Sequence, residues 1–126
     1  MNQPTPGLPA QIPVLALGDV LLVSLQGELH DGMAEQLQHD ITNRISTSRV
    51  TGVVIDISGV DMVDSFLGRV LAEIASTARL LAARTILAGM RPAVAITLVE
   101  LGLTLPGLVT ALDVDRAMEL LSQRGS

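Results

Sequence analysis

The chain has 126 residues, of which 48% are hydrophobic, only Phe66 is aromatic, and none is Cys, Trp or Tyr. All eight basic residues are Arg, and 13 acidic residues bring the formal net charge to −5. Without Cys or Lys, the chain can form no thiol nucleophile, disulfide, zinc–thiolate site or lysine Schiff base. An acidic chain with one aromatic ring also argues against nucleic-acid binding, which depends on a basic surface and stacking rings.

The length fits one domain with an aliphatic core. We expect a flexible lead over residues 1–11, a single domain over residues 12–122 and a short tail over residues 123–126. The longest apolar run, residues 101–112, contains Pro106 and is shorter than the roughly 20 residues that a membrane span needs. No basic residue precedes the first apolar run, so a secretory signal is not expected. The sequence therefore predicts a soluble, cytoplasmic domain.

The first half of the chain predicts a hairpin, a helix and a buried strand. Gly18-Asp19 separates the apolar runs Ile12–Leu17 and Val20–Gln26, which is typical of a hairpin turn. Helical spacing of apolar residues predicts a helix over Asp31–Ser48, with Asp31 as its N-cap. The β-branched run over residues 53–57 favours a strand buried on both faces, as in a parallel sheet.

The second half alternates helices and strands. In order, we expect a loop over Ser58–Asp64, a helix over Ser65–Ala83, a strand over Thr85–Ala88, a helix over Pro92–Leu101, a strand over Leu108–Ala111 and a helix capped by Asp113. This alternation predicts an α/β fold with a mixed, mostly parallel sheet, an N-terminal hairpin and about four helices.

The common catalytic motifs are missing from the sequence. It contains no dinucleotide-binding glycine motif, P-loop, nucleophile elbow or H-E-x-x-H zinc motif. His30 and His39 are nine residues apart, which places them on opposite sides of a helix, so they are not expected to share a metal. We expect no cofactor, no metal and no catalytic residue.

The most informative segment runs from the buried strand through the loop to Ser65. It holds three carboxylates, Asp56, Asp61 and Asp64, and in open α/β sheets sites collect outside the carboxyl ends of strands. The residues alone leave two interpretations open. Ser65 is an ordinary N-cap, with Asp64 favoured by the positive end of the helix. Alternatively, Ser65 is a phosphoacceptor, whose phosphate would add about −2 charges at the helix N-terminus.

The sequence Asp-Met-Val-Asp-Ser-Phe-Leu, which follows Val-Val-Ile-Asp-Ile, resembles the signature of STAS domains. Within that fold the chain most resembles the small RsbS-type proteins of stressosomes. The opening hairpin and the stretch Gly-Met-Arg-Pro-Ala-Val-Ala-Ile-Thr-Leu-Val-Glu-Leu-Gly, residues 89–102, support this closer resemblance. The resemblance runs from about Ile12 to Leu121.

The resemblance implies a scaffold protein that is not an enzyme and whose serine at position 65 is phosphorylated. The unmodified protein would hold an RsbT-type serine/threonine kinase on a large assembly built with RsbR-type STAS paralogues. Phosphorylation would release the kinase, and a phosphatase would reset the serine. Asp31 falls where RsbR-type proteins carry a second phosphorylatable residue, so only one phosphosite carries over, and Ser24 and Ser58 are regarded as strand-end residues.

We expect a kinase-facing surface next to Ser65, formed by Asp61, Met62, Asp64, Phe66 and Arg69. Phe66 could equally belong to the core, because it fits the apolar stripe of its helix. The sequence also leaves other functions to weigh. A simple phosphorylation-controlled anti-sigma-factor antagonist is the alternative to the scaffold, whereas a serine hydrolase and a nucleotide-binding domain are disfavoured by the missing motifs. We expect a homo-oligomer.

Overall fold

The computed structural model describes residues 12–27, 29–102 and 108–123. The expected lead over residues 1–11 and most of the expected tail, residues 124–126, lie outside these ranges. The nine elements follow the predicted order and are β1 (Val14–Leu17), β2 (Val20–Gln26), α1 (Asp31–Thr47), β3 (Gly52–Gly59), α2 (Ser65–Leu80), β4 (Arg84–Ala88), α3 (Pro92–Glu100), β5 (Leu108–Ala111) and α4 (Val114–Ser122).

The strands form one sheet in the order β1-β2-β3-β4-β5. β1 and β2 are antiparallel, with Val14 opposite Val23, and the turn between them contains Gly18 at a positive φ of 62°. The pairs β2–β3, β3–β4 and β4–β5 are parallel. The predicted mixed, mostly parallel sheet with an N-terminal hairpin is therefore confirmed.

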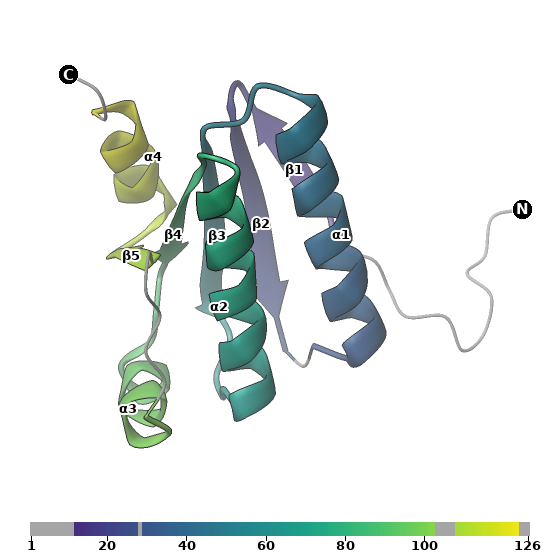
Figure 1. The fold of residues 1–126 in the computed structure, drawn as a ribbon. Coiled ribbons are helices and arrows are strands. Elements are labelled where there is room, and N and C mark those ends of the chain that lie inside the picture. Colours follow the sequence, from purple (N-terminus) through teal and green to yellow (C-terminus); the bar gives the residue numbers. More distant parts are fainter. Residues whose placement is uncertain (1–11, 28, 103–107, 124–126) are drawn as a thin grey trace, which may run out of the picture.

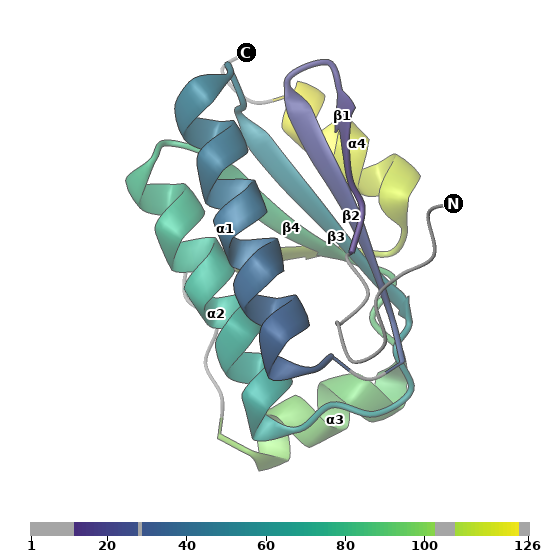
Figure 2. The ribbon, with the colours of Figure 1, turned by 90° about the vertical axis from the view of Figure 1, so that its right-hand side faces the viewer.

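The helices lie in three places around the sheet. α1 and α2 lie side by side on one face, and α4 lies on the opposite face (Figure 2). α3 lies beyond the end of the sheet at which β2 and β3 finish, and α1 and α2 begin at that same end (Figure 1). This arrangement brings three helix N-termini to the carboxyl edge of the parallel strands.

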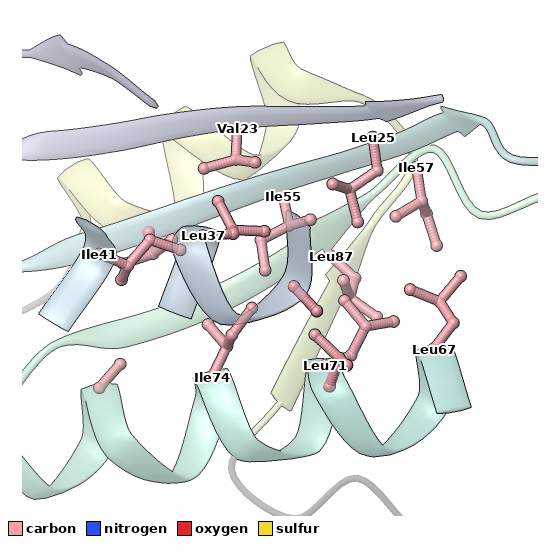
Figure 3. Packing of buried hydrophobic residues seen from close by; sticks show 14 of the residues in the cluster. Val23, Leu25, Leu37, Ile41, Ile55, Ile57, Leu67, Leu71, Ile74 and Leu87 are labelled. Carbon is pink, nitrogen blue, oxygen red and sulfur yellow. The ribbon is translucent and has the colours of Figure 1, made fainter. Parts of the chain in front are cut away.

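The larger part of the core lies between the sheet and the pair α1–α2. Leu37, Ile41, Leu71 and Ile74 of the two helices point toward side chains of β2, β3 and β4 (Figure 3). A smaller apolar cluster lies under α4 and includes Val54, Ile86, Ala117 and Leu121. Since consecutive residues of β3 face the two clusters in turn, the strand is buried on both faces as its sequence predicts.

At α1 and α2, the predicted helix ends differ from the structure. Asp31 is not the N-cap of α1: that position is His30, and Asp31 is the first helical residue. A carboxylate in the first turn still interacts favourably with the helix dipole. α2 ends at Leu80, earlier than Ala83, because Ala82 adopts a left-handed φ of 67° and the N–H of Ala83 turns back to the carbonyl of Ala78 at 2.8 Å.

The other two helix starts agree with the predictions. Pro92 is the first residue of α3, where its missing N–H is not needed. Asp113 is the N-cap of α4, and its carboxylate accepts a hydrogen bond from the N–H of Arg116 at 2.9 Å.

Candidate functional site

The connection between β3 and α2 forms part of the surface at the carboxyl edge of the sheet. Val60 and Val63 are buried in the larger core cluster and anchor this connection. Asp61 and Met62, between these anchors, are exposed, and Met62 is 84% exposed. A large apolar side chain that is so exposed contributes little to the core, so it is available for contact with a partner.

Asp64, and not Ser65, caps α2. Asp64 has an extended backbone, and its Oδ1 accepts a hydrogen bond from the N–H of Leu67 at 2.9 Å. Of the two interpretations of Ser65, the one that makes it the N-cap is therefore wrong, because Asp64 takes that position and Ser65 is already helical. Both residue types make good caps, so the pair Asp-Ser did not determine which would take the position.

Ser65 is consequently the first helical residue of α2, and it is exposed. Its hydroxyl makes no hydrogen bond within the part of the chain that the structure describes. A serine whose hydroxyl is neither capping nor buried is accessible to a modifying enzyme. A nucleophilic serine is activated by a general base that is hydrogen-bonded to it. Among the described residues, no such base contacts Ser65.

Phe66 and Arg69 extend this surface differently. Phe66 is half-buried and packs against the larger core cluster, so part of its ring belongs to the core. Arg69 is exposed and lies four residues after Ser65, on the same face of α2. Of the five residues expected beside Ser65, Asp61, Met62, Asp64 and Arg69 are thus at the surface, and Phe66 is divided between core and surface.

Asp56 has a structural role at the end of β3. Its Oδ1 accepts a hydrogen bond from the N–H of Ser58 at 3.0 Å, which holds the chain in a local turn. The three carboxylates that the sequence groups together therefore have three different partners: Asp56 holds Ser58, Asp64 caps α2, and Asp61 pairs with an arginine from another loop.

That arginine is Arg91, a residue for which the sequence alone indicates no role. Its Nη1 lies 2.9 Å from Oδ1 of Asp61, and its Nε donates to the carbonyl of Ser58 at 2.9 Å. The approach depends on Gly89, which has a φ of 76° and at which a Cβ would lie 2.9 Å from the Cβ of Ser58. The stretch Gly-Met-Arg-Pro was the only available signal for this residue, and nothing local in it indicates the contact.

The remaining candidates do not form a second site. His30 and His39 are exposed, and within residues 12–27, 29–102 and 108–123 no three His, Asp or Glu side chains are grouped so as to hold a metal. A cavity of about 30 Å³ lies between Leu25, Met33, Val60 and Leu67. This is room for about one water molecule, far below the several hundred Å³ of a nucleotide-sized pocket. No described helix is long and apolar enough to cross a membrane.

Comparisons with known proteins agree with this geometry. The STAS domain family model matches residues 11–115. A structure of a serine-to-glutamate variant of RsbS from Moorella thermoacetica superposes with a TM-score of 0.78 at 39% identity, covering 88% of this chain and 94% of that one. A chain from a structure of the molecular architecture of the stressosome superposes with a TM-score of 0.77 at 41% identity, covering 87% and 96%.

Among curated proteins, the RsbT co-antagonist protein RsbRA of Bacillus subtilis is 29% identical over 101 residues, which is 80% of this chain. The chain spans 37% of the length of that relative. The fold is also that of the anti-sigma factor antagonist SpoIIAA, with a TM-score of 0.72 at 21% identity over 91% of this chain and 99% of that one.

Proposed function

Because this chain belongs to the STAS domain family, we propose that it is a non-enzymatic regulatory scaffold of the stressosome type, acting in the cytoplasm and controlled by phosphorylation of Ser65. In its unmodified form it binds a serine/threonine kinase of the RsbT type, and phosphorylation by that kinase ends the binding. The observation that carries the proposal is the exposed hydroxyl of Ser65 at the start of α2, which makes no hydrogen bond to any residue that the structure describes.

The surroundings of Ser65 explain how a phosphate would act. The phosphate would add about −2 charges next to the carboxylate of Asp64, which already occupies the N–H of Leu67. The N–H of Leu67 is therefore not available to the phosphate, which would lie beside a second negative charge. A partner docked on Met62 and the start of α2 would face like-charge repulsion and an added desolvation cost, and its affinity would fall.

The relatives support the identity of the partners. The RsbS-type structures match this chain over nearly all of both lengths at about 40% identity, and the RsbRA match covers most of the chain. We therefore propose RsbR-type STAS proteins as assembly partners, an RsbT-type kinase as the regulated partner and a phosphatase that resets Ser65. Asp31 is exposed at the start of α1, and since it has no hydroxyl it leaves Ser65 as the single phosphosite.

Phosphate mapping tests the site. The protein is incubated with ATP and an RsbT-type kinase, and the modified residue is located by mass spectrometry. We expect one phosphate on Ser65, its loss in Ser65→Ala and its retention in Ser58→Ala. Ser58 is a matched control, because it is an exposed serine at the same edge and its substitution keeps the Cβ that packs beside Gly89. Incorporation that persists in Ser65→Ala would remove the site assignment.

Size-exclusion chromatography with light scattering separates the scaffold from the simpler anti-sigma-factor antagonist. With an RsbR-type partner, the scaffold is expected to elute as a very large particle containing both proteins. A monomer or dimer that does not change in size on addition of the partner would favour the simple antagonist.

A further inference from the structure

We propose that Arg91 is a positioning residue that holds the loop of the phosphoacceptor serine in its binding conformation. The role of Arg91 in kinase binding rests on the proposed function, whereas its contacts with Ser58 and Asp61 do not. We call the contact of Arg91 with Ser58 and Asp61 the Arg91 latch. It joins the start of α3 to the connection between β3 and α2, across 33 residues of sequence.

The latch has two parts that act on one stretch of backbone. The Nε of Arg91 donates to the carbonyl of Ser58 at 2.9 Å, while the N–H of Ser58 donates to Oδ1 of Asp56 at 3.0 Å. Both backbone polar groups of Ser58 are therefore held by side chains. The second nitrogen, Nη1, lies 2.9 Å from Asp61, three residues further along. The planar fork of a guanidinium can make both contacts together, which an ammonium group cannot do in the same geometry.

The latch contributes more to the loop than to the fold. The side chains of Arg91 and Asp61 are 55% and 76% exposed, and exposed ion pairs add little to global stability. The buried side chains of Val60 and Val63 fix the loop from inside, and the latch fixes the segment that precedes Met62 from outside. It also neutralises one carboxylate close to Ser65, so that an approaching kinase meets a less acidic loop.

Amide hydrogen exchange tests the latch without any kinase. In Arg91→Ala we expect exchange in residues 58–63 to accelerate roughly 3–10-fold, as for the loss of one exposed ion pair and one hydrogen bond, with α4 unchanged. Asp61→Ala should accelerate it less, because the contact with Ser58 remains. The double variant should match Arg91→Ala alone, since both substitutions act through the same contact.

Arg116→Ala is the matched control, because Arg116 is an exposed arginine paired with Asp113 at 3.2 Å on the opposite face of the sheet. It should leave exchange in residues 58–63 unchanged. Unchanged exchange in Arg91→Ala, or a double variant whose effect is the product of the two single effects, would overturn the latch.

Steady-state phosphorylation by an RsbT-type kinase tests its role in the switch. Because the latch positions the loop but does not take part in phosphate transfer, Arg91→Ala should raise the KM for the protein substrate several-fold and leave kcat nearly unchanged. An unchanged KM in Arg91→Ala, with Ser65 phosphorylated normally, would overturn the positioning role and leave the proposed function standing. A wild-type protein that is not phosphorylated on Ser65 would instead overturn the proposed function, while the exchange experiment would still decide the latch.

Discussion

The cap of α2 can be removed in two ways that separate its hydrogen bond from its charge. Asp64→Ala removes both the acceptor for the N–H of Leu67 and the negative charge at the helix end. Asp64→Asn keeps an acceptor of similar shape and removes only the charge. Because Asn is about as good an N-cap as Asp, the two variants should differ in stability.

The structure sets the expected size of these effects. Loss of an N-cap typically costs about 1 kcal/mol, and loss of the charge–dipole interaction alone costs about 0.3–1 kcal/mol. Seven residues of α2 are buried, so the start of this helix is tied to the global unfolding transition. With an unfolding entropy of about 2.1 cal/mol/K per residue, a chain of 126 residues should lose roughly 4 °C in Tm for each kcal/mol.

Urea and thermal unfolding, followed by circular dichroism, measure both variants. We expect Asp64→Ala to lower the free energy of unfolding by about 1–2 kcal/mol and Asp64→Asn to lower it by about half as much or less. Equal losses in the two variants would show that the charge, and not the hydrogen bond, stabilises α2. No loss in either variant would refute the assignment of Asp64 as the cap.

Three further substitutions test other features of the structure. Thr85→Val should raise the free energy of unfolding by about 1 kcal/mol, because Oγ1 of Thr85 is buried and has no hydrogen-bond partner among the described residues. Thr51→Val, which loses a 2.8 Å hydrogen bond to Asp19, is the control of opposite sign in the same urea titration. Ala82→Gly should stabilise by about 0.5–1 kcal/mol in thermal unfolding, since glycine adopts the left-handed backbone of that position without strain, and a loss of stability would contradict this account of the α2 terminus. Met62→Ser should leave Tm within about 2 °C of the wild type while weakening kinase binding in calorimetry, and an unchanged affinity would remove Met62 from the contact surface.

The order of elements followed from the sequence because each signal is local and strong. The alternation of β-branched runs with helical apolar stripes is visible without any tertiary information, and Pro92 and Asp113 stand at helix starts as their chemistry predicts. The helix caps at Asp31 and Ser65 were each misplaced by one residue. In both cases neighbouring residues could occupy the cap, and the backbone dihedral angles decide between them.

The parts of the site that could not be predicted depend on contacts between distant segments. Arg91 reaches Asp61 only because Gly89 lets the turn after β4 approach the end of β3, and no local pattern encodes that approach. The division of the carboxylates also has a tertiary cause. In the sequence Asp56, Asp61 and Asp64 form one acidic group, whereas in the fold each has a separate partner.

The affinity of an RsbT-type kinase for the unmodified and the phosphorylated protein decides whether phosphorylation of Ser65 releases the kinase. Both forms are purified, stoichiometric phosphorylation of Ser65 is verified by mass spectrometry, and binding is measured by titration calorimetry at one ionic strength. We expect the unmodified protein and Ser65→Ala to bind the kinase alike, and the phosphorylated protein to bind at least about tenfold more weakly, which corresponds to about 1.4 kcal/mol. Equal affinity of the two forms would contradict the claim that a charge at the start of α2 releases the kinase.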